Sequence, residues 1–242
     1  MRLDLYLTTN FNIQSRNKAN ELIKSNKVKC NGAIIAKPSF NVEDHHTIEL
    51  LEEDFYVSRA AYKLKYFLDE LHLEFKNKEA LDIGSSTGGF TQILLENGIQ
   101  KVTCVDVGSN QLHPLLKNHP KIEFFEQCDI RNFKPNKTFD IVTCDVSFIS
   151  LHNILNAIHE LSSSEIILLF KPQFEVGNST KRDKKGVVQD QKAIELARLR
   201  FIEATQKLQW ECLKNSPSQL QGKEGNLEEL FYFKKILRIN ND

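Results

Sequence analysis

The sequence predicts an α/β protein in which a small basic α+β module precedes a doubly wound, mainly parallel sheet. Apolar strand-like segments alternate with segments of helical periodicity from residue 79 to about 208. A glycine-rich loop, 84–89, joins the first of these strands to the next helix. Finally, residues 1–40 carry seven Lys or Arg and two acidic residues, although the whole chain has 32 of each charge. A length of 242 residues accommodates one sizeable domain and one small module.

Composition indicates a soluble protein of the cytoplasm. A hydrophobic content of 40% is ordinary for a globular chain, so a packed core is expected. No apolar run approaches the roughly 18–20 residues of a membrane-spanning helix, and the first residues lack the pattern of a signal peptide. The five cysteines are scattered without a CxxC pair, which is typical of reduced thiols. We therefore expect no membrane partner and no metal site.

The basic module is expected to occupy residues 1–53. Ser15 is suited to cap the second of two short helices, because its hydroxyl can accept from a free backbone N–H. Asn31-Gly32 is a strong signal for a tight hairpin turn. The acidic stretch 41–54, which has no Lys or Arg, then leads to a linker at 54–58. The expected elements are two helices, a hairpin and a return strand, over 2–7, 15–24, 27–34 and 47–50.

This pattern resembles the S4 RNA-binding domain. The matching residues are Ser15-Arg16, Ala19, Ile23, Val28, Asn31-Gly32 and Lys37-Pro38. The resemblance implies recognition of structured RNA, in which phosphate contacts fix position and carry little sequence information. A solvated charged face is the alternative interpretation of the same basic residues. The candidates for phosphate contact in this module are Arg2, Arg16, Lys18 and Lys37.

The second part begins with a helix predicted over 59–71, with Ser58 as its cap. Its apolar residues recur at helical spacing and are expected to be buried. Arg59 and Lys63, four residues apart, share another face of the helix. Arg59 is a further candidate for RNA contact, and a solvated surface pair is the alternative. The apolar stripe consists of Ala61, Leu64, Leu68 and Leu71.

The glycine-rich loop opens a cofactor-binding half. Glycine permits positive φ and brings backbone close to a ligand, although a tight turn without a ligand is the alternative. Asp106 ends the second strand about twenty residues past the loop, where a carboxylate can accept from two ribose hydroxyls. The spacing departs from G-x-G-x-x-G, so a pyrophosphate is not the first expectation. Strands are expected over 79–83, 101–106, 122–126 and 138–145, with a helix over 89–97.

This order resembles the Rossmann-type methyltransferases that depend on S-adenosylmethionine (SAM). Asp82 and the loop give the motif D-x-G-x-x-x-G-G. The resemblance implies that Asp106 binds the ribose of SAM and that Asp129 and Ile130 hold the adenine. The resemblance also implies that the methionine part of SAM is surrounded by Asp82, Gly84, Ser85, Gly88, Gly89 and Phe90.

The last third supplies the chemistry. A strand predicted over 165–170 runs into Lys171-Pro172, and the proline favours an extended conformation at Lys171 and ends the pairing. Lys171 is therefore expected at a strand end, near Asp145 at the end of the preceding strand. A basic loop over 181–188, a long helix over 190–208 and a last strand over 229–236 follow.

Four motifs in this region resemble the TlyA family, in which an S4 domain precedes a methyltransferase of the FtsJ (RrmJ) type. They are D-V-S-F-I-S-L, K-P-Q-F-E-V-G, K-G-V-V-x-D and S-P…G-x-E-G-N-x-E. The resemblance implies SAM-dependent 2′-O-methylation of cytidine in ribosomal RNA (rRNA), with the large subunit favoured and the small subunit open. It also assigns a catalytic tetrad to Lys63, Asp145, Lys171 and Glu228.

The tetrad suits a ribose hydroxyl, which is a poor acid and a weak nucleophile. Lys171 is expected to stabilise the developing alkoxide, as an oxyanion hole does. Asp145 and Glu228 orient the lysines, and either is a candidate general base. Lys63 completes the cluster or holds the target ribose. Two other hypotheses remain: a non-catalytic RNA-binding or ribosome-assembly factor, and a membrane-active haemolysin, for which no signal peptide or amphipathic apolar segment is found.

Overall fold

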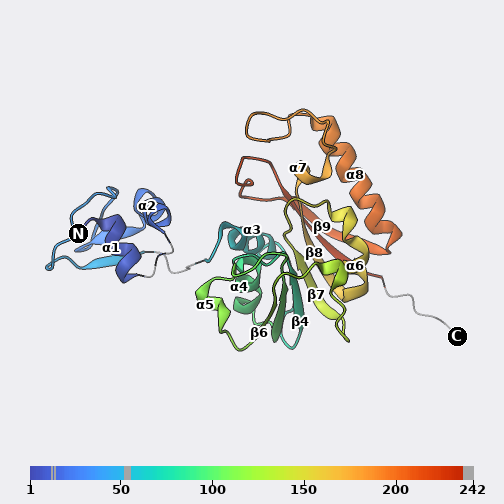
Figure 1. The fold of residues 1–242 in the computed structure, drawn as a ribbon, viewed down its shortest axis with the longest axis horizontal. Helices are drawn as coiled ribbons and strands as arrows, with labels where there is room; N and C mark the ends of the chain where they lie inside the picture. Colours follow the sequence, from blue (N-terminus) through green and yellow to red (C-terminus); the bar gives the residue numbers. More distant parts are fainter. Residues whose placement is uncertain (12, 14, 52–55, 237–242) are drawn as a thin grey trace. The chain divides into compact units, whose positions relative to one another are not determined.

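The computed structural model describes every residue except 12, 14, 52–55 and 237–242. It divides into two compact units, Met1–Phe55 and Tyr56–Asp242, and each is described by itself (Figure 1). Of the predicted linker 54–58, residues 54 and 55 lie outside the described part of the chain. Val57 is buried in the second unit, where its backbone N–H donates to the side chain of Gln92 at 2.9 Å. The second unit therefore begins before the helix that was predicted to open it.

The first unit packs two helices against a three-stranded antiparallel sheet of order β2-β1-β3. Ser15 caps α2 as predicted, since its hydroxyl accepts from the backbone of Lys18 at 3.2 Å. Asn31 and Gly32 have φ of 48° and 79°, as a two-residue hairpin turn requires, and this confirms the predicted hairpin. The elements are α1 (Leu3–Asn10), α2 (Arg16–Lys24), β1 (Val28–Cys30), β2 (Ala33–Ile34) and β3 (Ile48–Leu50).

The second unit is built on a seven-stranded sheet of order β6-β5-β4-β7-β8-β10-β9. Neighbouring strands are parallel except where β10 pairs antiparallel with β8 and β9. From β4 the chain moves outward to β6 and returns on the other side at β7. This reversal creates a crevice at the carboxyl ends of β4 and β7, where ligands bind in such sheets. The strands are β4 (Glu79–Ile83), β5 (Lys101–Val105), β6 (Ile122–Phe125), β7 (Phe139–Cys144), β8 (Ser162–Phe170), β9 (Trp210–Pro217) and β10 (Glu229–Lys235).

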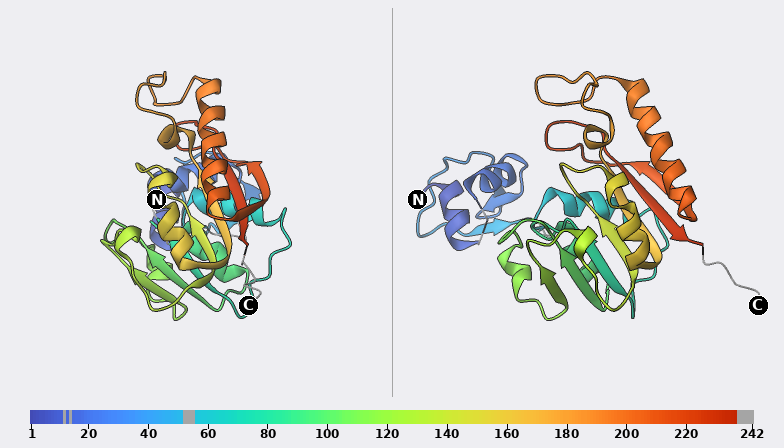
Figure 2. Two further views of the ribbon diagram at one scale, coloured as in Figure 1. Left: turned by 90° about the vertical axis from the view of Figure 1, so that its right-hand side faces the viewer. Right: turned by 45° about the vertical axis from the view of Figure 1, so that its right-hand side comes forward.

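Helices cover both faces of this sheet (Figure 2). On one face α3 and α4 join the core cluster that includes Ala80 of β4, and on the other α6 and α8 join the cluster that includes Leu81 and Ile83. Burial on both faces explains the nearly continuous apolar composition of the central strands. The helices are α3 (Arg59–Leu68), α4 (Gly89–Glu96), α5 (Pro114–Lys117), α6 (Leu155–Leu161), α7 (Pro172–Glu175) and α8 (Gln191–Lys207).

Two local predictions need correction. Ser58 stands at the N-cap of α3, but its side chain makes no cap hydrogen bond; a Cβ on Gly89 would stand 2.2 Å from its Oγ. Ser58 therefore fits against the start of α4, and α3 ends at Leu68. The strand β9 was not predicted, because its exposed edge carries polar residues and gives little apolar alternation.

Candidate active site

The crevice is formed by the loops that follow β4 and β7. Gly84 turns the first loop with φ of 74°, and a Cβ there would stand 2.8 Å from the carbonyl oxygen of Asp145. Both the backbone conformation and this neighbour require glycine. The residue that begins the glycine-rich loop thus lets the two loops meet at the centre of the sheet edge.

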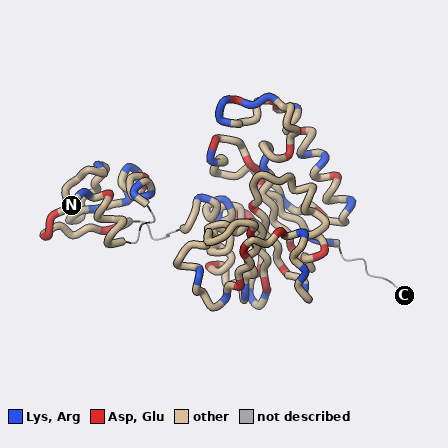
Figure 3. Tube along the Cα trace, viewed as in Figure 1, with Lys and Arg blue, Asp and Glu red and all other residues tan. Residues whose placement is uncertain are grey.

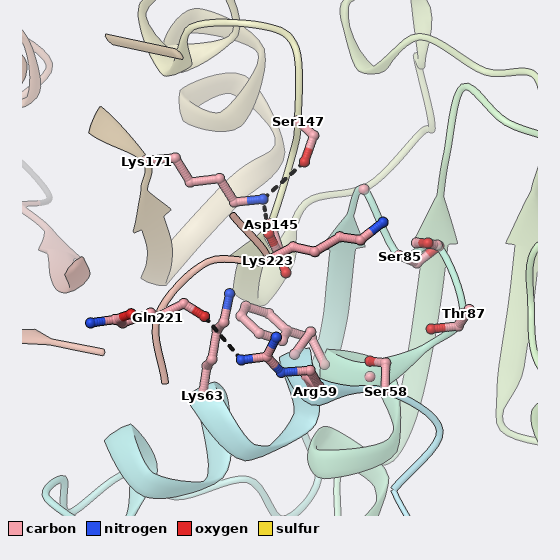
Figure 4. Close-up of a pocket in the computed structure, with 15 residues that line it drawn as sticks. Ser58, Arg59, Lys63, Ser85, Thr87, Asp145, Ser147, Lys171, Gln221 and Lys223 are labelled. Atoms are coloured by element: carbon pink, nitrogen blue, oxygen red, sulfur yellow. Dashed lines mark hydrogen bonds and ion pairs between the residues drawn. The ribbon is translucent and has the colours of Figure 1, made fainter. Parts of the chain in front are cut away.

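A cavity of about 560 Å³ opens beside these loops and is bounded by α3 and the segment before β10 (Figure 4). Its volume lies within the range of small-molecule sites. Among its described lining residues, four are cationic and one, Asp145, is a carboxylate. The cations are Arg59, Lys63, Lys171 and Lys223.

The four predicted catalytic residues form two ion pairs here. Lys171 Nζ lies 2.6 Å from Asp145 Oδ1 and donates to Ser147 Oγ at 3.0 Å. Lys63 Nζ donates to Glu228 Oε2 at 2.5 Å. The side chains are only 3–14% exposed, and charges this far from water are stable only when they are paired. The pairing therefore fixes the position of each ammonium group at the cavity.

Glu228 is held at both of its oxygens. Gln173 Nε2 donates to Oε1 at 3.1 Å, while Lys63 occupies Oε2. A Cβ on Gly222 would stand 2.6 Å from Oε1, so the loop before β10 packs directly on this carboxylate. Glu228 is consequently oriented from three directions.

Asp82 lies beneath the glycine-rich loop, and its side chain lines neither this cavity nor the second one described below. It is completely buried and accepts hydrogen bonds from the hydroxyls of Thr91 at 2.6 Å and Thr143 at 2.8 Å. Burial raises the pKa of its carboxyl to about 6. The position supports the loop from below, because one threonine comes from α4 and the other from β7.

The other predicted residues of the loop divide into two groups. Gly88 has φ of 92°, stands at the N-cap of α4 and packs against Leu112 and Leu116 without lining either cavity. The residues of the loop and of the start of α4 that line the first cavity are Gly84, Ser85, Ser86, Thr87, Gly89 and Phe90.

A second cavity of about 360 Å³ lies on the other side of Gly84 and contains the remaining predicted cofactor residues. Asp106 accepts from the backbone N–H of Ser86 at 2.8 Å and of Gly108 at 2.7 Å. Asp129 accepts from the side chain and backbone of Arg131, which hold the pKa of Asp129 below its usual value. Ile130 lines the same cavity. The second cavity thus combines two carboxylates, Asp106 and Asp129, with the apolar side chain of Ile130.

In the first unit, two of the predicted RNA-binding residues converge on one buried carboxylate. Arg2 binds both oxygens of Asp4 at 3.0 Å, and Arg16 binds Oδ2 at 2.8 Å. The hydrogen bond from Arg2, with that from Arg16, holds the pKa of Asp4 well below its usual range. The two arginine side chains remain 52% and 56% exposed.

The other predicted RNA-binding residues lie at the surface in less constrained settings. Lys18 is 3.5 Å from Glu21, and Lys37 is exposed. In the second unit Arg59 is exposed at the cavity and donates to the carbonyl of Gln221 at 3.2 Å (Figure 4).

Sequence reasoning missed several residues of the site. Ser147 and Gln173 lie inside the D-V-S-F and K-P-Q-F motifs, two residues after Asp145 and Lys171, and that proximity was the available signal. Lys223 reaches across the cavity in Figure 4 from a loop that the pattern did not place. Phe148 is 91% exposed with φ of 65° and packs against Phe174 with ring centroids 5.3 Å apart.

Among the residues that the structure describes, no group of three or more His, Cys, Asp or Glu side chains is arranged to hold a metal ion. In the same part of the chain, no helix is both long and apolar enough to cross a bilayer.

The fold and crevice define an α/β protein of the class that binds a nucleoside-containing cofactor at the carboxyl ends of its strands. Residues 56–235 match the FtsJ-like methyltransferase family, and residues 1–48 match the S4 domain. The chain therefore belongs to the FtsJ-like methyltransferase family and carries an S4 domain, which confirms the predicted fold class and family.

Relatives of known name share this arrangement. The 23S rRNA (cytidine-2′-O)-methyltransferase TlyA of Campylobacter jejuni is 49% identical over 255 residues, covering 97% of this chain and 100% of that protein. The 16S/23S rRNA (cytidine-2′-O)-methyltransferase TlyA of Mycobacterium tuberculosis is 34% identical over 96% of this chain and 89% of that protein. A solved structure from Streptococcus thermophilus, described as a hemolysin, has a TM-score of 0.72 and 30% identity over 97% of this chain and 88% of its own.

Proposed function

We propose that this chain transfers a methyl group from SAM to the 2′-hydroxyl of a cytidine in ribosomal RNA. The observation that carries the proposal is the pair of buried lysine–carboxylate contacts, Lys171–Asp145 and Lys63–Glu228, at a cavity beside the glycine-rich loop. The names of the relatives from C. jejuni and M. tuberculosis support the same substrate class.

The residues of the crevice fit SAM. Each Asp106 oxygen accepts one backbone N–H and retains capacity for another donor, which suits the two ribose hydroxyls. Asp129 and Ile130 offer an acidic and an apolar contact to an adenine. Ser85, Gly89 and Phe90 line the adjoining cavity for the methionine part. On this assignment Asp82 and Gly88 act on the cofactor through the loop that they support, and not by direct contact.

When bound, SAM supplies an electrophilic methyl group on a sulfonium. The task of the chain is then to hold a ribose oxygen in line with that methyl, and positioning of this kind contributes up to roughly 7–11 kcal/mol. An ammonium group has three N–H donors; Lys171 donates one to Ser147 and forms an ion pair with Asp145 Oδ1 at 2.6 Å. A remaining N–H is available to stabilise charge that develops on the 2′-oxygen.

Asp145 is the better placed proton acceptor of the two carboxylates. Glu228 already accepts from Lys63 and Gln173 at its two oxygens. Asp145 pairs with Lys171 through Oδ1, and among the described residues no hydrogen bond to its Oδ2 is found. We therefore assign the general base to Asp145, which would take the proton of the 2′-hydroxyl while the methyl group leaves the sulfur of SAM. Lys63 lines the cavity and holds the ribose, and Glu228 orients Lys63.

The S4 unit is assigned to RNA binding. Arg2, Arg16, Lys18 and Lys37 are all partly or fully exposed, and their role is to fix the position of the RNA through phosphates. In the second unit Arg59 extends this function to the mouth of the cavity. An S4 domain recognises RNA shape more than base edges, so the target nucleotide is set by the fold of the rRNA. We favour the large ribosomal subunit, in the cytoplasm.

The test is to map 2′-O-methylcytidine in rRNA from cells that have the gene, lack it, or carry Lys171→Ala. We expect at least one modified cytidine that disappears in the second and third cases. If cells that lack the gene show a ribosome defect but keep every 2′-O-methylcytidine, the protein is a binding factor and not a methyltransferase. Leakage of liposomes by the purified protein would indicate a membrane-active one.

A further inference from the structure

The basic loop before α8 is a preformed hairpin. Its two sides are joined by hydrogen bonds from the N–H of Gln189 to the carbonyl of Lys181 at 3.0 Å, and from the N–H of Asp183 to the carbonyl of Val187 at 2.9 Å. Gly186 turns the tip with φ of 84° and donates to the carbonyl of Asp183 at 3.0 Å. We call residues 181–189 the basic hairpin. Its fixed backbone means that little conformational entropy is lost when a ligand binds.

The acidic residue of the basic hairpin, Asp183, stabilises the turn through hydrogen bonds to the backbone. Asp183 Oδ1 accepts from the backbone N–H of Lys185 at 2.8 Å and of Val187 at 2.9 Å. This carboxylate is therefore engaged with the backbone, and no ion pair between it and a neighbouring cation is found within the described residues.

The basic side chains of the hairpin have two different roles. Arg182 turns inward and donates to the backbone carbonyls of Gln173 at 2.9 Å and Val176 at 3.5 Å. The three lysines of the basic hairpin are exposed, and none of them forms an ion pair within the described chain. Figure 3 shows the resulting cluster of basic residues on the loop that precedes α8. The outward residues are Lys181, Lys184 and Lys185.

The basic hairpin is attached to the catalytic cluster at two points. Arg182 holds the backbone of Gln173, whose side chain donates to Glu228. On the other side, the N–H of Val188 donates to Asn226 Oδ1 at 3.0 Å, two residues before Glu228. The hairpin that carries the exposed lysines is therefore hydrogen-bonded to the segments that hold Gln173 and Glu228 at the proposed site of methyl transfer.

We propose that the basic hairpin is a second RNA-binding element, in which Lys181, Lys184 and Lys185 contact phosphates of the RNA next to the target nucleotide. This rests on the proposed function for the identity of the polyanion as rRNA. Three exposed ammonium groups without an ion-pair partner among the described residues, carried on a hydrogen-bonded hairpin, match the charge of a phosphate backbone and offer no base-specific donors in a fixed fork. The hairpin thus strengthens binding and holds the strand at the crevice, while the S4 unit recognises a separate part of the RNA.

The experiment compares the full-length protein with the triple variant Lys181→Gln/Lys184→Gln/Lys185→Gln. The probe is the large ribosomal subunit purified from a strain that lacks the gene. At about 0.15 M salt we expect roughly tenfold weaker binding, with a rise in KM for the subunit of similar size. The slope of log K against log salt should fall by about 2, since each lost phosphate contact contributes roughly 0.7–0.9.

A charge-matched control is available in the same unit. Lys76, Lys117 and Lys207 are exposed lysines outside the hairpin, and replacing all three by Gln removes the same net charge. We expect less than a twofold change in affinity for this control. Equal effects of the two triple variants on affinity and salt slope would overturn the proposal, because general charge would then explain the binding.

Two further outcomes separate this proposal from others. If wild-type protein binds subunits but transfers no methyl group, the proposed function fails, and the binding comparison still tests the hairpin. If the triple hairpin variant loses binding to vesicles of phosphatidylglycerol and phosphatidylethanolamine but keeps its affinity for subunits, the hairpin serves a membrane surface and the proposal is wrong. Unchanged thermal unfolding of the variant excludes misfolding as the cause of any loss.

Discussion

The two units of this protein pair their cations with carboxylates in different ways. In the S4 unit, Arg2 and Arg16 share the buried Asp4 and remain 52% and 56% exposed. In the methyltransferase unit, Lys63 and Lys171 each have a carboxylate partner and are only 10% exposed. Exposed guanidinium groups retain donors for a phosphate, whereas buried ammonium groups are fixed at one point. The comparison separates the residues that we propose bind RNA from the residues that we propose act on a single atom.

The largest effect is expected from Asp145→Asn, which removes the assigned proton acceptor and the partner of Lys171. Loss of a general base lowers the rate by roughly 10²–10⁴-fold. Single-turnover methyl transfer at saturating SAM and ribosomal subunit measures this step, and Glu228→Gln is the matched control with a smaller loss. A larger loss for Glu228→Gln than for Asp145→Asn would reverse the assignment of the two carboxylates.

The buried carboxylates of the two units should respond to pH in opposite directions. The folded-state pKa of Asp82 is raised to about 6, so its charged form is disfavoured in the fold. Its contribution to stability is therefore largest below the unfolded pKa of roughly 4 and decreases as pH rises to about 6, by about 2–3 kcal/mol. The folded pKa of Asp4 is lowered, so its contribution is present above pH 4 and lost as pH falls further.

Asp82→Asn tests this difference because asparagine cannot ionise. Calorimetric unfolding of the full chain should show the variant gaining stability relative to wild type between pH 4 and 6, with no further change above pH 6.5. The hydroxyls of Thr91 and Thr143 can rotate to suit an amide, so the packing is retained. A difference between the two proteins that does not vary with pH would contradict the raised pKa of Asp82.

A moderate effect is expected at Gln173, which orients Glu228 without lining the first cavity. Gln173→Ala should lower kcat by about tenfold, comparable to the loss of one hydrogen bond to a charged group. KM for SAM should not change. Gln173→Glu, which places a second carboxylate against Glu228, should be at least as harmful, and full activity of this variant would show that the contact has no role in orientation.

The smallest effect is expected from single changes at the exposed arginines. Arg16→Gln leaves Arg2 bound to Asp4 and should raise KM for the ribosomal subunit about threefold to tenfold at unchanged kcat. The salt dependence of binding should weaken by the equivalent of one phosphate contact. An effect confined to kcat would indicate a catalytic role for Arg16 and contradict its proposed role in RNA binding.

The sequence predicted most of the strands, the helices that became α3, α4 and α8, and the residues at the strand ends, because periodicity and glycine spacing reflect local geometry. Asp106 lines the second cavity as expected of a carboxylate that ends a strand. Asp82 shows the limit of this reasoning, since a motif position does not reveal whether a side chain points into the crevice or beneath it. The edge strand β9 escaped prediction because its pairing depends on β10, which follows it in the chain.

The partners within the site were only partly predictable from the sequence. Lys171 was expected near Asp145, because both follow neighbouring strands, and the structure pairs them. The sequence did not assign Glu228 to Lys63, because this pairing joins segments that are distant in sequence. The contact between Gln173 and Glu228 likewise depends on β10 lying next to β8, a position that becomes known only with the fold.

The most direct test of the account is methyl transfer from labelled SAM to purified large ribosomal subunits, with the product nucleoside identified by mass spectrometry. Wild-type protein should produce 2′-O-methylcytidine. Lys171→Met should produce at least about a hundredfold less while still binding SAM and the subunit. A methyl group on a base, or full activity of Lys171→Met, would contradict the claim that these buried ion pairs carry out ribose methylation.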